Sequence, residues 1–181
     1  KHHYCYKVSS LIPEKNHSYQ VTFQFDHHQV ILNLSTSVVE RYGLFVGQVV
    51  DREELDALKD QEQVAIAYRM ALKYLSYKDY TYAKMQKRLK ERGHFDDIQI
   101  DMTMDLLVQK NLIDDSEYTR NYFQKATRLG LGVQKIVYNI KKEGVSSTII
   151  DEYLDHYSSE QEYEKAMDIV QKLYNENTTK P

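Results

Sequence analysis

The sequence is poor in cysteine, proline and glycine, and each shortage excludes a class of protein. With 1 cysteine among 181 residues, the chain has no internal disulfide and no four-cysteine zinc site. The 2 prolines and 6 glycines argue against an all-β fold with many turns and against a long disordered tail. No run of about 18 apolar residues occurs, so no segment is predicted to cross a membrane.

The first residues also lack the apolar core of a signal peptide. They read Lys-His-His-Tyr-Cys without an initiator Met, which we interpret as a fragment or a processed chain. A single cysteine fits a reducing compartment, so the sequence predicts a cytoplasmic protein. A content of 41% hydrophobic and 28% charged residues is typical of a globular chain. Its length gives room for one ordinary domain or two small ones.

The first 50 residues are predicted to form a small β-rich module. Residues 19–25 and 30–34 are β-prone, and the polar tetrapeptide 26–29 between them predicts a hairpin. Residues 8–12 are predicted to add a third strand. Because a lone hairpin is marginally stable in water, we expect this module to pack on a helix.

From Asp51 onward the pattern is helical, and part of it repeats at an offset of 51 residues. Residues 88–93, ending in Gly93, align with residues 139–144, ending in Gly144. Each unit is therefore predicted to contain three short helices, with a left-handed glycine after the second that lets the chain reverse. Periodic units of this size indicate a tandem array in which each unit contacts its neighbours.

The predicted fold is mainly α, with tandem three-helix repeats preceded by a small β-hairpin-containing N-terminal module. A capping-box pattern at residues 159–162 predicts the start of a third unit, in which the sequence ends after one helix. The predicted divisions are a module at 1–50, a linker or short helix at 51–64, repeat 1 at 65–115, repeat 2 at 116–158, and the first helix of a truncated repeat 3 at 159–181.

The sequence contains no motif that predicts catalysis. A Gly-rich phosphate loop, His-Glu-x-x-His, Cys-x-x-Cys and Gly-x-Ser-x-Gly are all missing. The potential metal ligands lie in or beside the β-rich part, where adjacent histidines on a strand point to opposite faces. They are His2, His3, Cys5, His17, His27 and His28. We therefore expect no enzyme, no metal, no cofactor and no small-molecule substrate.

Two pairs of adjacent carboxylates permit either acid–base chemistry or helix capping. The pairs are Asp96-Asp97 and Asp114-Asp115, and each directly precedes a helical run. An Asp at this place accepts from free backbone N–H groups and meets the favourable end of the helix dipole. We favour capping.

Positive charge is concentrated in the middle of the chain. Residues 65–145 carry 15 Lys/Arg and 10 Asp/Glu, whereas residues 1–64 and 146–181 have net charges of −3 and −5. The candidate binding residues lie on the second helix of each unit. They are Lys84, Lys87, Arg88 and Arg92 in the first unit and Lys135, Lys141 and Lys142 in the second. These residues form either a solvated helix face or a stripe that binds acidic protein or DNA phosphates.

Several runs together resemble a known family. They are Leu112-Ile-Asp-Asp-Ser-Glu-Tyr118, Gly130-Leu-Gly-Val-Gln-Lys-Ile136 and Ile140-Lys-Lys-Glu-Gly-Val145. In this order and spacing they are similar to the RecX family of recombinase regulators, and residues 71–81 with 89–93 are similar to its first unit. The hairpin followed by residues 44–48 resembles the N-terminal module of longer, Gram-positive-type members.

The sequence departs from the family pattern at a few positions. The family often has Arg-Ser-x-x-Glu at the start of the second helix, whereas this chain has Tyr80-Thr81 and then Lys84. Thr119 stands where the family usually has alanine. Longer members continue through at least one more unit.

The resemblance implies a regulator of the RecA recombinase that is not an enzyme. Such proteins lie in the groove of the nucleoprotein filament, hinder strand exchange and filament growth, and modulate ATPase and co-protease activity. The implied partner is the RecA-type filament, with contact to single- or double-stranded DNA through the phosphate backbone left open. Two alternatives remain: a helical DNA-binding transcription regulator, and a purely structural α-solenoid scaffold.

Overall fold

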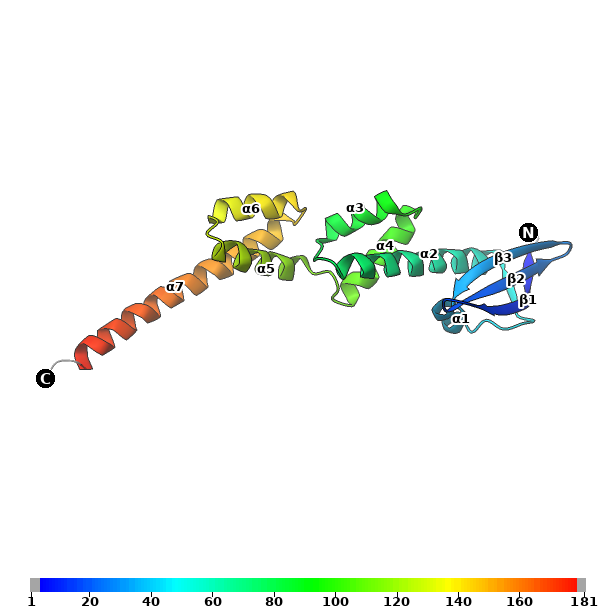
Figure 1. Cartoon of the computed structure of the whole chain (residues 1–181), viewed down its shortest axis with the longest axis horizontal. Coiled ribbons are helices and arrows are strands. Elements are labelled where there is room, and N and C mark those ends of the chain that lie inside the picture. Colours follow the sequence, from blue (N-terminus) through cyan, green and yellow to red (C-terminus); the bar gives the residue numbers. More distant parts are fainter. Residues whose placement is uncertain (1–3, 179–181) are drawn as a thin grey trace. The chain divides into compact units, whose positions relative to one another are not determined.

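The structure, a computed structural model, describes residues 4–178 and divides into two units (Figure 1). Unit 1 consists of Lys1–Lys78 and Gln86–Leu112, and unit 2 of Asp79–Met85 and Ile113–Pro181. The fold is mainly α with a small N-terminal sheet, which confirms the predicted class.

The sheet of unit 1 has four antiparallel strands in the order β3-β2-β1-β4. They are β1 (Cys5–Glu14), β2 (Ser18–Phe25), β3 (His28–Ser35) and β4 (Val49–Asp51). The predicted hairpin is confirmed, because Phe25 pairs with His28 across a tight turn. The third strand is confirmed as well, although β1 continues through Pro13, which pairs with Tyr19. The sequence analysis missed β4, whose three residues pair with the start of β1.

The N-terminal module shares its core with the helix that follows it. Val8, Val21 and Phe23 of the sheet are fully buried together with Leu55 and Leu58 of α2 (Arg52–Leu75). The helix α1 (Thr36–Tyr42), which ends at the left-handed Gly43, adds Val38 and Val39 to this core. The expected packing of the module on a helix is therefore confirmed.

The linker or short helix predicted at residues 51–64 is the first part of α2, one continuous helix of 24 residues. It begins with the predicted capping box, in which Asp51 accepts from the N–H of Glu54 and the Glu54 side chain accepts from the N–H of Asp51. Its first half contacts the sheet, so the predicted boundary at 64/65 lies inside the helix. Glu62, 8% exposed, reinforces this contact by accepting from the backbone N–H and the hydroxyl of Ser35 at 2.8 and 2.6 Å.

The rest of repeat 1 consists of α3 (Tyr82–Arg92) and α4 (Asp97–Gln109). Asp96 caps α4 and forms a capping box with Gln99, which confirms the capping role predicted for the Asp96-Asp97 pair. The prediction that Gly93 adopts a left-handed conformation is wrong, because Gly93 is not among the residues with positive φ. A Cβ at this position would overlap the Phe95 ring, so the close approach of Phe95 explains the glycine.

Unit 2 contains α5 (Asp115–Arg128), α6 (Val133–Lys142) and α7 (Ser147–Thr178). Its core is formed mainly by fully buried apolar side chains of the three helices, including Phe123, Ile136, Ile140 and Ile150. Thr119, the polar exception in the repeat, is also buried, and its hydroxyl donates to the Asp115 carbonyl at 2.7 Å. That bond satisfies the hydroxyl within its own helix.

The first turn of α3 packs within unit 2 rather than unit 1. The hydroxyl of Thr81 donates to the Glu143 carbonyl at 2.6 Å, and the backbone N–H of Tyr82 donates to the Asp115 carboxylate at 2.8 Å. Gly144, with a φ of 88°, has the predicted left-handed conformation, and a Cβ there would lie 2.6 Å from the Ala83 Cβ. This junction is therefore tightly packed.

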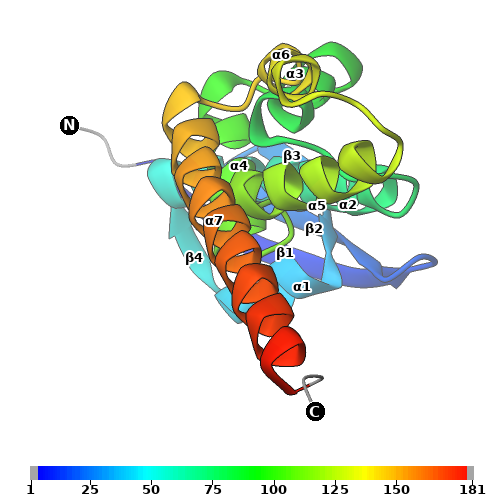
Figure 2. The same cartoon turned by 90° about the vertical axis from the view of Figure 1, so that its left-hand side faces the viewer.

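The expected start of a third repeat at residues 159–162 is wrong, because α7 runs unbroken from Ser147 to Thr178 (Figure 2). A Ser-x-x-Glu pattern caps a helix only where the preceding residues are not helical. Here the preceding turn is helical, and the hydroxyl of Ser159 donates to the Asp155 carbonyl at 2.9 Å. The predicted apolar residues Tyr163, Met167 and Val170 are exposed.

Candidate partner-binding surface

On α3, three of the four predicted basic residues already interact within the chain. Lys84 forms an ion pair with Glu143 at 3.8 Å, and Lys87 forms one with Glu91 at 3.7 Å. The guanidinium of Arg88 lies over the ring of Tyr74, 5.0 Å from its centroid. These interactions leave less of their charge for a partner.

Arg88 and Arg92 differ in what surrounds them. The Nε of Arg88 is buried, and no residue of the described chain accepts a hydrogen bond from it. The Arg88 side chain is therefore partly a packing element of unit 1, held by its cation–π contact. Arg92 is exposed in the last turn of α3, and no ion pair within residues 4–178 involves it. Of the four, Arg92 is the most available.

The basic residues of α6 are more available than those of α3. Lys141 and Lys142 are exposed in the last turn, and neither has an ion-pair partner within the described part of the chain. Lys135 is also exposed, with its ammonium 5.2 Å from the Tyr138 ring centroid. Cations at a helix C-terminus are favoured by the helix dipole and remain accessible to a ligand.

The structure brings together basic residues from both repeats within unit 2. The ion pair with Glu143 places Lys84 at the turn that directly follows Lys141 and Lys142. We call Lys84, Lys141 and Lys142 the α6 basic cluster. Lys87, Arg88 and Arg92 belong to unit 1, so the predicted residues are divided between the two units.

The sequence analysis missed two basic residues on α5. Lys125 and Arg128 are exposed in its last turn, directly before Leu129, which is 71% exposed. Neither has an ion-pair partner among residues 4–178. Their position in the last turn of a predicted helix was the available signal, but their charge does not repeat, because the residues 51 positions earlier are Tyr74 and Tyr77.

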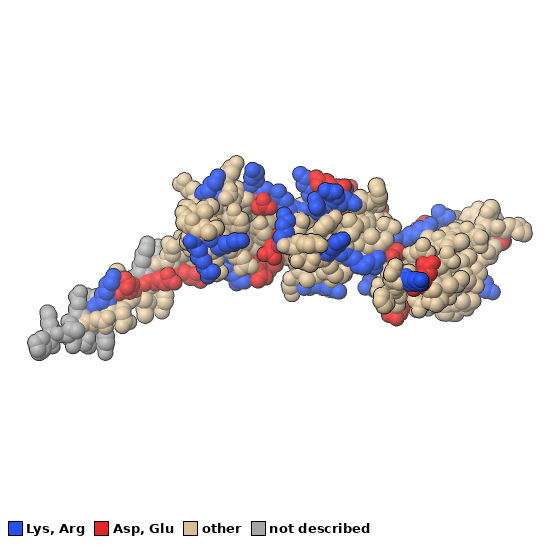
Figure 3. Space-filling model, viewed as in Figure 1, with Lys and Arg blue, Asp and Glu red and all other residues tan. Residues whose placement is uncertain are grey.

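Charge differs between the elements of unit 2. The helix α7 carries 8 Asp/Glu and 2 Lys, whereas α6 carries 3 Lys and no carboxylate. Figure 3 shows Lys and Arg side chains over α5 and α6 and acidic side chains along α7. An anionic partner is therefore attracted to the α5–α6 part of unit 2 and repelled by α7.

Three of the four carboxylates considered for acid–base chemistry, Asp96, Asp114 and Asp115, accept from backbone N–H groups, whereas Asp97 forms an ion pair with Lys90 at 3.1 Å. Asp114 accepts from the N–H groups of Ser116 and Glu117 at 2.9 and 3.1 Å and so caps α5. Asp115 accepts instead from Tyr82 at the start of α3. Burial raises the pKa of Asp115, the Tyr82 N–H opposes this rise, and the charge of Asp114 adds to it. Capping is confirmed, and Asp115 caps a helix other than its own.

Tyr118 lies at the same junction. Its ring stacks on Tyr122 with centroids 6.2 Å apart. Burial, with the nearby Glu143 and Tyr122, raises the pKa of Tyr118 to about 12. The phenol therefore remains protonated, and a packing role suits it better than acid–base chemistry.

Residues 4–178 contain no group of three His, Cys, Asp or Glu side chains arranged for a metal ion. None of the helices in that range has the length and hydropathy needed to span a bilayer.

Together, the fold and this surface define a tandem three-helix-repeat protein with a basic face. The family model described as "RecX, first three-helix domain" matches residues 67–107. The Regulatory protein RecX of Clostridium beijerinckii is 29% identical over 171 residues, which cover 93% of this chain and 78% of that protein. The Regulatory protein RecX of Clostridium botulinum (strain Alaska E43 / Type E3) is 27% identical, with the same coverage.

A solved structure agrees with these relatives. The "Crystal structure of regulatory protein RecX" has a TM-score of 0.69 and 25% sequence identity, covering 97% of this chain and 86% of that chain. The family model, the named relatives over most of the chain and this solved structure together support the RecX family for this chain, and that family is one of regulatory proteins. These relatives support a regulatory role.

Proposed function

We propose that this chain binds the nucleoprotein filament of a RecA-type recombinase and lowers its strand exchange, ATP hydrolysis and co-protease activity. The relatives named Regulatory protein RecX support the regulatory part of this proposal. Regulation by binding needs an exposed surface and no catalytic group. Because such a filament forms on DNA in the cytoplasm, the proposal includes a cytoplasmic location.

The observation that carries the proposal is the α6 basic cluster. Lys141 and Lys142 are exposed cations without an internal counter-ion among the described residues, next to Lys84. A nucleoprotein filament presents DNA phosphates and acidic protein side chains, both of which attract such a cluster. If phosphates are contacted, the affinity falls with salt by about 0.7–0.9 log units per log unit of salt for each contact.

The contributions of the seven predicted residues are expected to differ. Most of the binding comes from the residues that no ion pair within the described residues involves, which are Lys141, Lys142, Lys135 and Arg92. Lys84 and Lys87 contribute less, since each first has to leave a carboxylate. Arg88 contributes mainly to packing against Tyr74. Its substitution therefore tests stability and binding at once, and it is a poor choice for a binding test.

The test measures DNA-dependent ATP hydrolysis and strand exchange by the cognate recombinase with increasing amounts of the full chain. We expect inhibition at sub-stoichiometric to near-stoichiometric protein. The variant Lys141→Glu/Lys142→Glu should need about tenfold more protein for the same inhibition, since removing two charge-assisted contacts costs about 1.4 kcal/mol or more. Its helicity, measured by circular dichroism, should be unchanged because both side chains are exposed.

The matched control is Lys7→Glu/Lys15→Glu, which makes the same change in net charge on exposed residues of the N-terminal module. It should inhibit like the unmodified chain. Equal inhibition by all three proteins at physiological salt would remove the α6 basic cluster from the proposal. An absence of inhibition at any ratio would reject filament regulation, and a footprint on one particular duplex sequence would favour a transcription regulator.

A further inference from the structure

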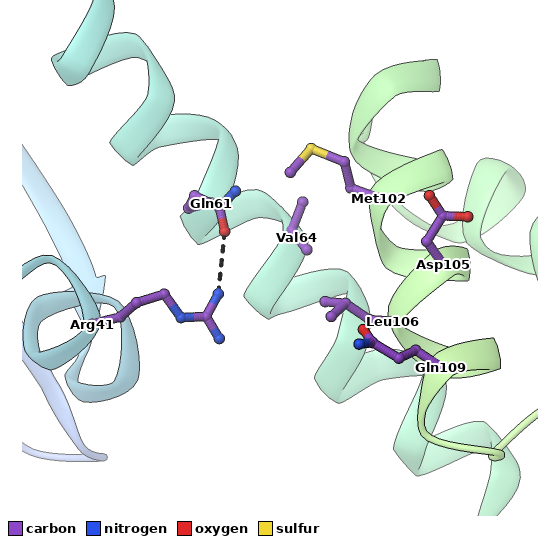
Figure 4. A pocket seen from close by; sticks show the side chains of 7 residues that line it. All are labelled: Arg41, Gln61, Val64, Met102, Asp105, Leu106 and Gln109. Atoms are coloured by element: carbon purple, nitrogen blue, oxygen red, sulfur yellow. Dashed lines mark hydrogen bonds between the residues drawn. The ribbon is translucent and has the colours of Figure 1, made fainter.

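Unit 1 carries a groove that the basic residues do not line. It has a volume of about 280 Å³ and lies between α2 and α4, with α1 at one side (Figure 4). Gln61 and Val64 come from α2, with Arg41 of α1 on one side of that helix and the lining residues of α4 on the other. Those α4 residues are Met102, Asp105, Leu106 and Gln109. The groove thus joins the N-terminal module to repeat 1 on a surface of its own.

The groove is apolar at its centre and small. Val64 is 3% exposed, and Met102 and Leu106 are half-buried beside it. Pockets for cofactors and drug-sized ligands usually have volumes of about 300–1,000 Å³. This groove lies just below that range and suits one or two inserted side chains. Methionine adapts its shape to such an insert more readily than a branched side chain does.

The two sides of the groove carry opposite charges. Arg41 and Asp105 lie on opposite sides of Val64 (Figure 4). Among the described residues, the guanidinium of Arg41 donates only one hydrogen bond, a long one of 3.5 Å to the Gln61 side chain. Asp105 is exposed, and within residues 4–178 its carboxylate has neither an ion pair nor a hydrogen bond. Each charge is therefore available to a ligand.

We propose that this groove binds a segment of a protein partner that inserts one apolar side chain over Val64. The segment places a carboxylate toward Arg41 and a cation toward Asp105. The charge pattern argues for this occupant, because Asp101 is exposed one turn before Asp105 and the two carboxylates repel a polyanion. The groove thus selects a chemistry different from that of the α6 basic cluster. Peptides bind other helical grooves through apolar anchors in the same way.

The test uses the full chain with labelled methionine methyl groups and three synthetic helical peptides. All three carry the same central Leu, flanked by Glu and Lys, by Glu on both sides, or by Lys on both sides. We expect the NMR signal of Met102, assigned with Met102→Leu, to shift saturably. The Glu/Lys peptide should bind at least tenfold more tightly than the other two.

Charge reversal in the protein tests the assignment directly. Arg41→Glu should bind the Lys/Lys peptide most tightly, and Asp105→Lys should bind the Glu/Glu peptide most tightly. Both side chains are exposed, so the thermal midpoint should change little. The variant Lys141→Glu/Lys142→Glu should give the titration of the unmodified chain, which separates this proposal from the proposed filament contact.

Three results would overturn the proposal. The first is a Met102 signal that no peptide shifts at millimolar concentration. The second is a shift without the expected change of preference in the Arg41 and Asp105 variants, which would mean an apolar contact without charge selection. The third is a shift that depends on protein concentration without peptide, which would assign the groove to a second copy of the chain.

Discussion

Gly93 and Gly144 occupy the same position in two repeats, yet they are glycines for different physical reasons. Gly93 lies directly against the Phe95 ring and does not adopt a left-handed φ. Gly144 has a φ of 88°, and a Cβ added there would lie 2.6 Å from the Ala83 Cβ. A repeated residue therefore marks a position where space or backbone conformation is restricted, but it does not reveal which restriction applies.

The basic residues of the two second helices show the same kind of difference. On α3, Lys84, Lys87 and Arg88 interact with Glu143, Glu91 and Tyr74. On α6, Lys141 and Lys142 have no such partner within the described residues. The second helices of the two repeats thus differ in the positive charge that is available to a partner. Substitutions at the two glycines, at Asp115 and at the pair of Lys84 with Glu143 test how far the repeats differ.

The largest expected effect is at Gly144. Gly144→Ala introduces a Cβ 2.6 Å from the Ala83 Cβ at a residue with left-handed φ. Strain and overpacking together predict a loss of about 2–4 kcal/mol in the free energy of unfolding. Urea denaturation followed by circular dichroism measures this loss.

Two further variants separate the causes at the two glycines. Adding Ala83→Gly to Gly144→Ala should recover the steric part and leave the backbone strain, apart from a helix-propensity cost of about 1 kcal/mol. Gly93→Ala should cost less than Gly144→Ala, about 1 kcal/mol, because the half-exposed Phe95 ring can rotate away. Equal losses at both glycines would contradict the difference between the repeats.

Local sequence signals predicted the parts of the fold that depend on neighbouring residues. The hairpin and the caps at Asp51, Asp96 and Asp114 each follow from a few adjacent side chains. The strand β4 was missed because its three residues are held by pairing with β1, far away in the sequence. The break expected at Ser159 was wrong because the pattern that starts a helix also fits inside one.

The candidate site was predictable as a set of charges but not as a surface. Lysine and arginine at repeated positions follow from the sequence alone. Their partners do not, because the contact of Arg88 with Tyr74 and the ion pair of Lys84 with Glu143 join residues that are distant in the chain. Asp115 shows the same limit, since it caps α3 from 33 residues away.

A smaller effect is expected at Asp115 and depends on pH. Burial raises the pKa of Asp115 in the folded chain above its unfolded value. The stabilisation that the Asp115 carboxyl contributes is therefore fully present below its pKa in the unfolded chain, and it is lost as the pH rises through its pKa in the folded chain. Asp115→Asn keeps an oxygen that accepts from the Tyr82 N–H without the buried charge, so at pH 7 it should be at least as stable as the unmodified chain.

Urea midpoints at pH 4 and pH 7 test this expectation. The stability of the unmodified chain relative to Asp115→Asn should fall between pH 4 and pH 7. Asp115→Ala, which also loses the acceptor for Tyr82, should be less stable than the unmodified chain by about 1 kcal/mol. A less stable Asn variant at pH 7 would mean that the charge of Asp115 strengthens the cap.

The smallest expected effect is at the ion pair of Lys84 with Glu143. Their charged atoms are 3.8 Å apart, and the side chains are 43% and 37% exposed. A pair this exposed contributes about 0–1 kcal/mol and weakens with salt. A double-mutant cycle of Lys84→Met and Glu143→Gln should therefore give a coupling below about 0.5 kcal/mol that vanishes in high salt. A larger coupling that persists in salt would mean that Lys84 is committed to Glu143, leaving Lys141 and Lys142 as the available cations of the α6 basic cluster.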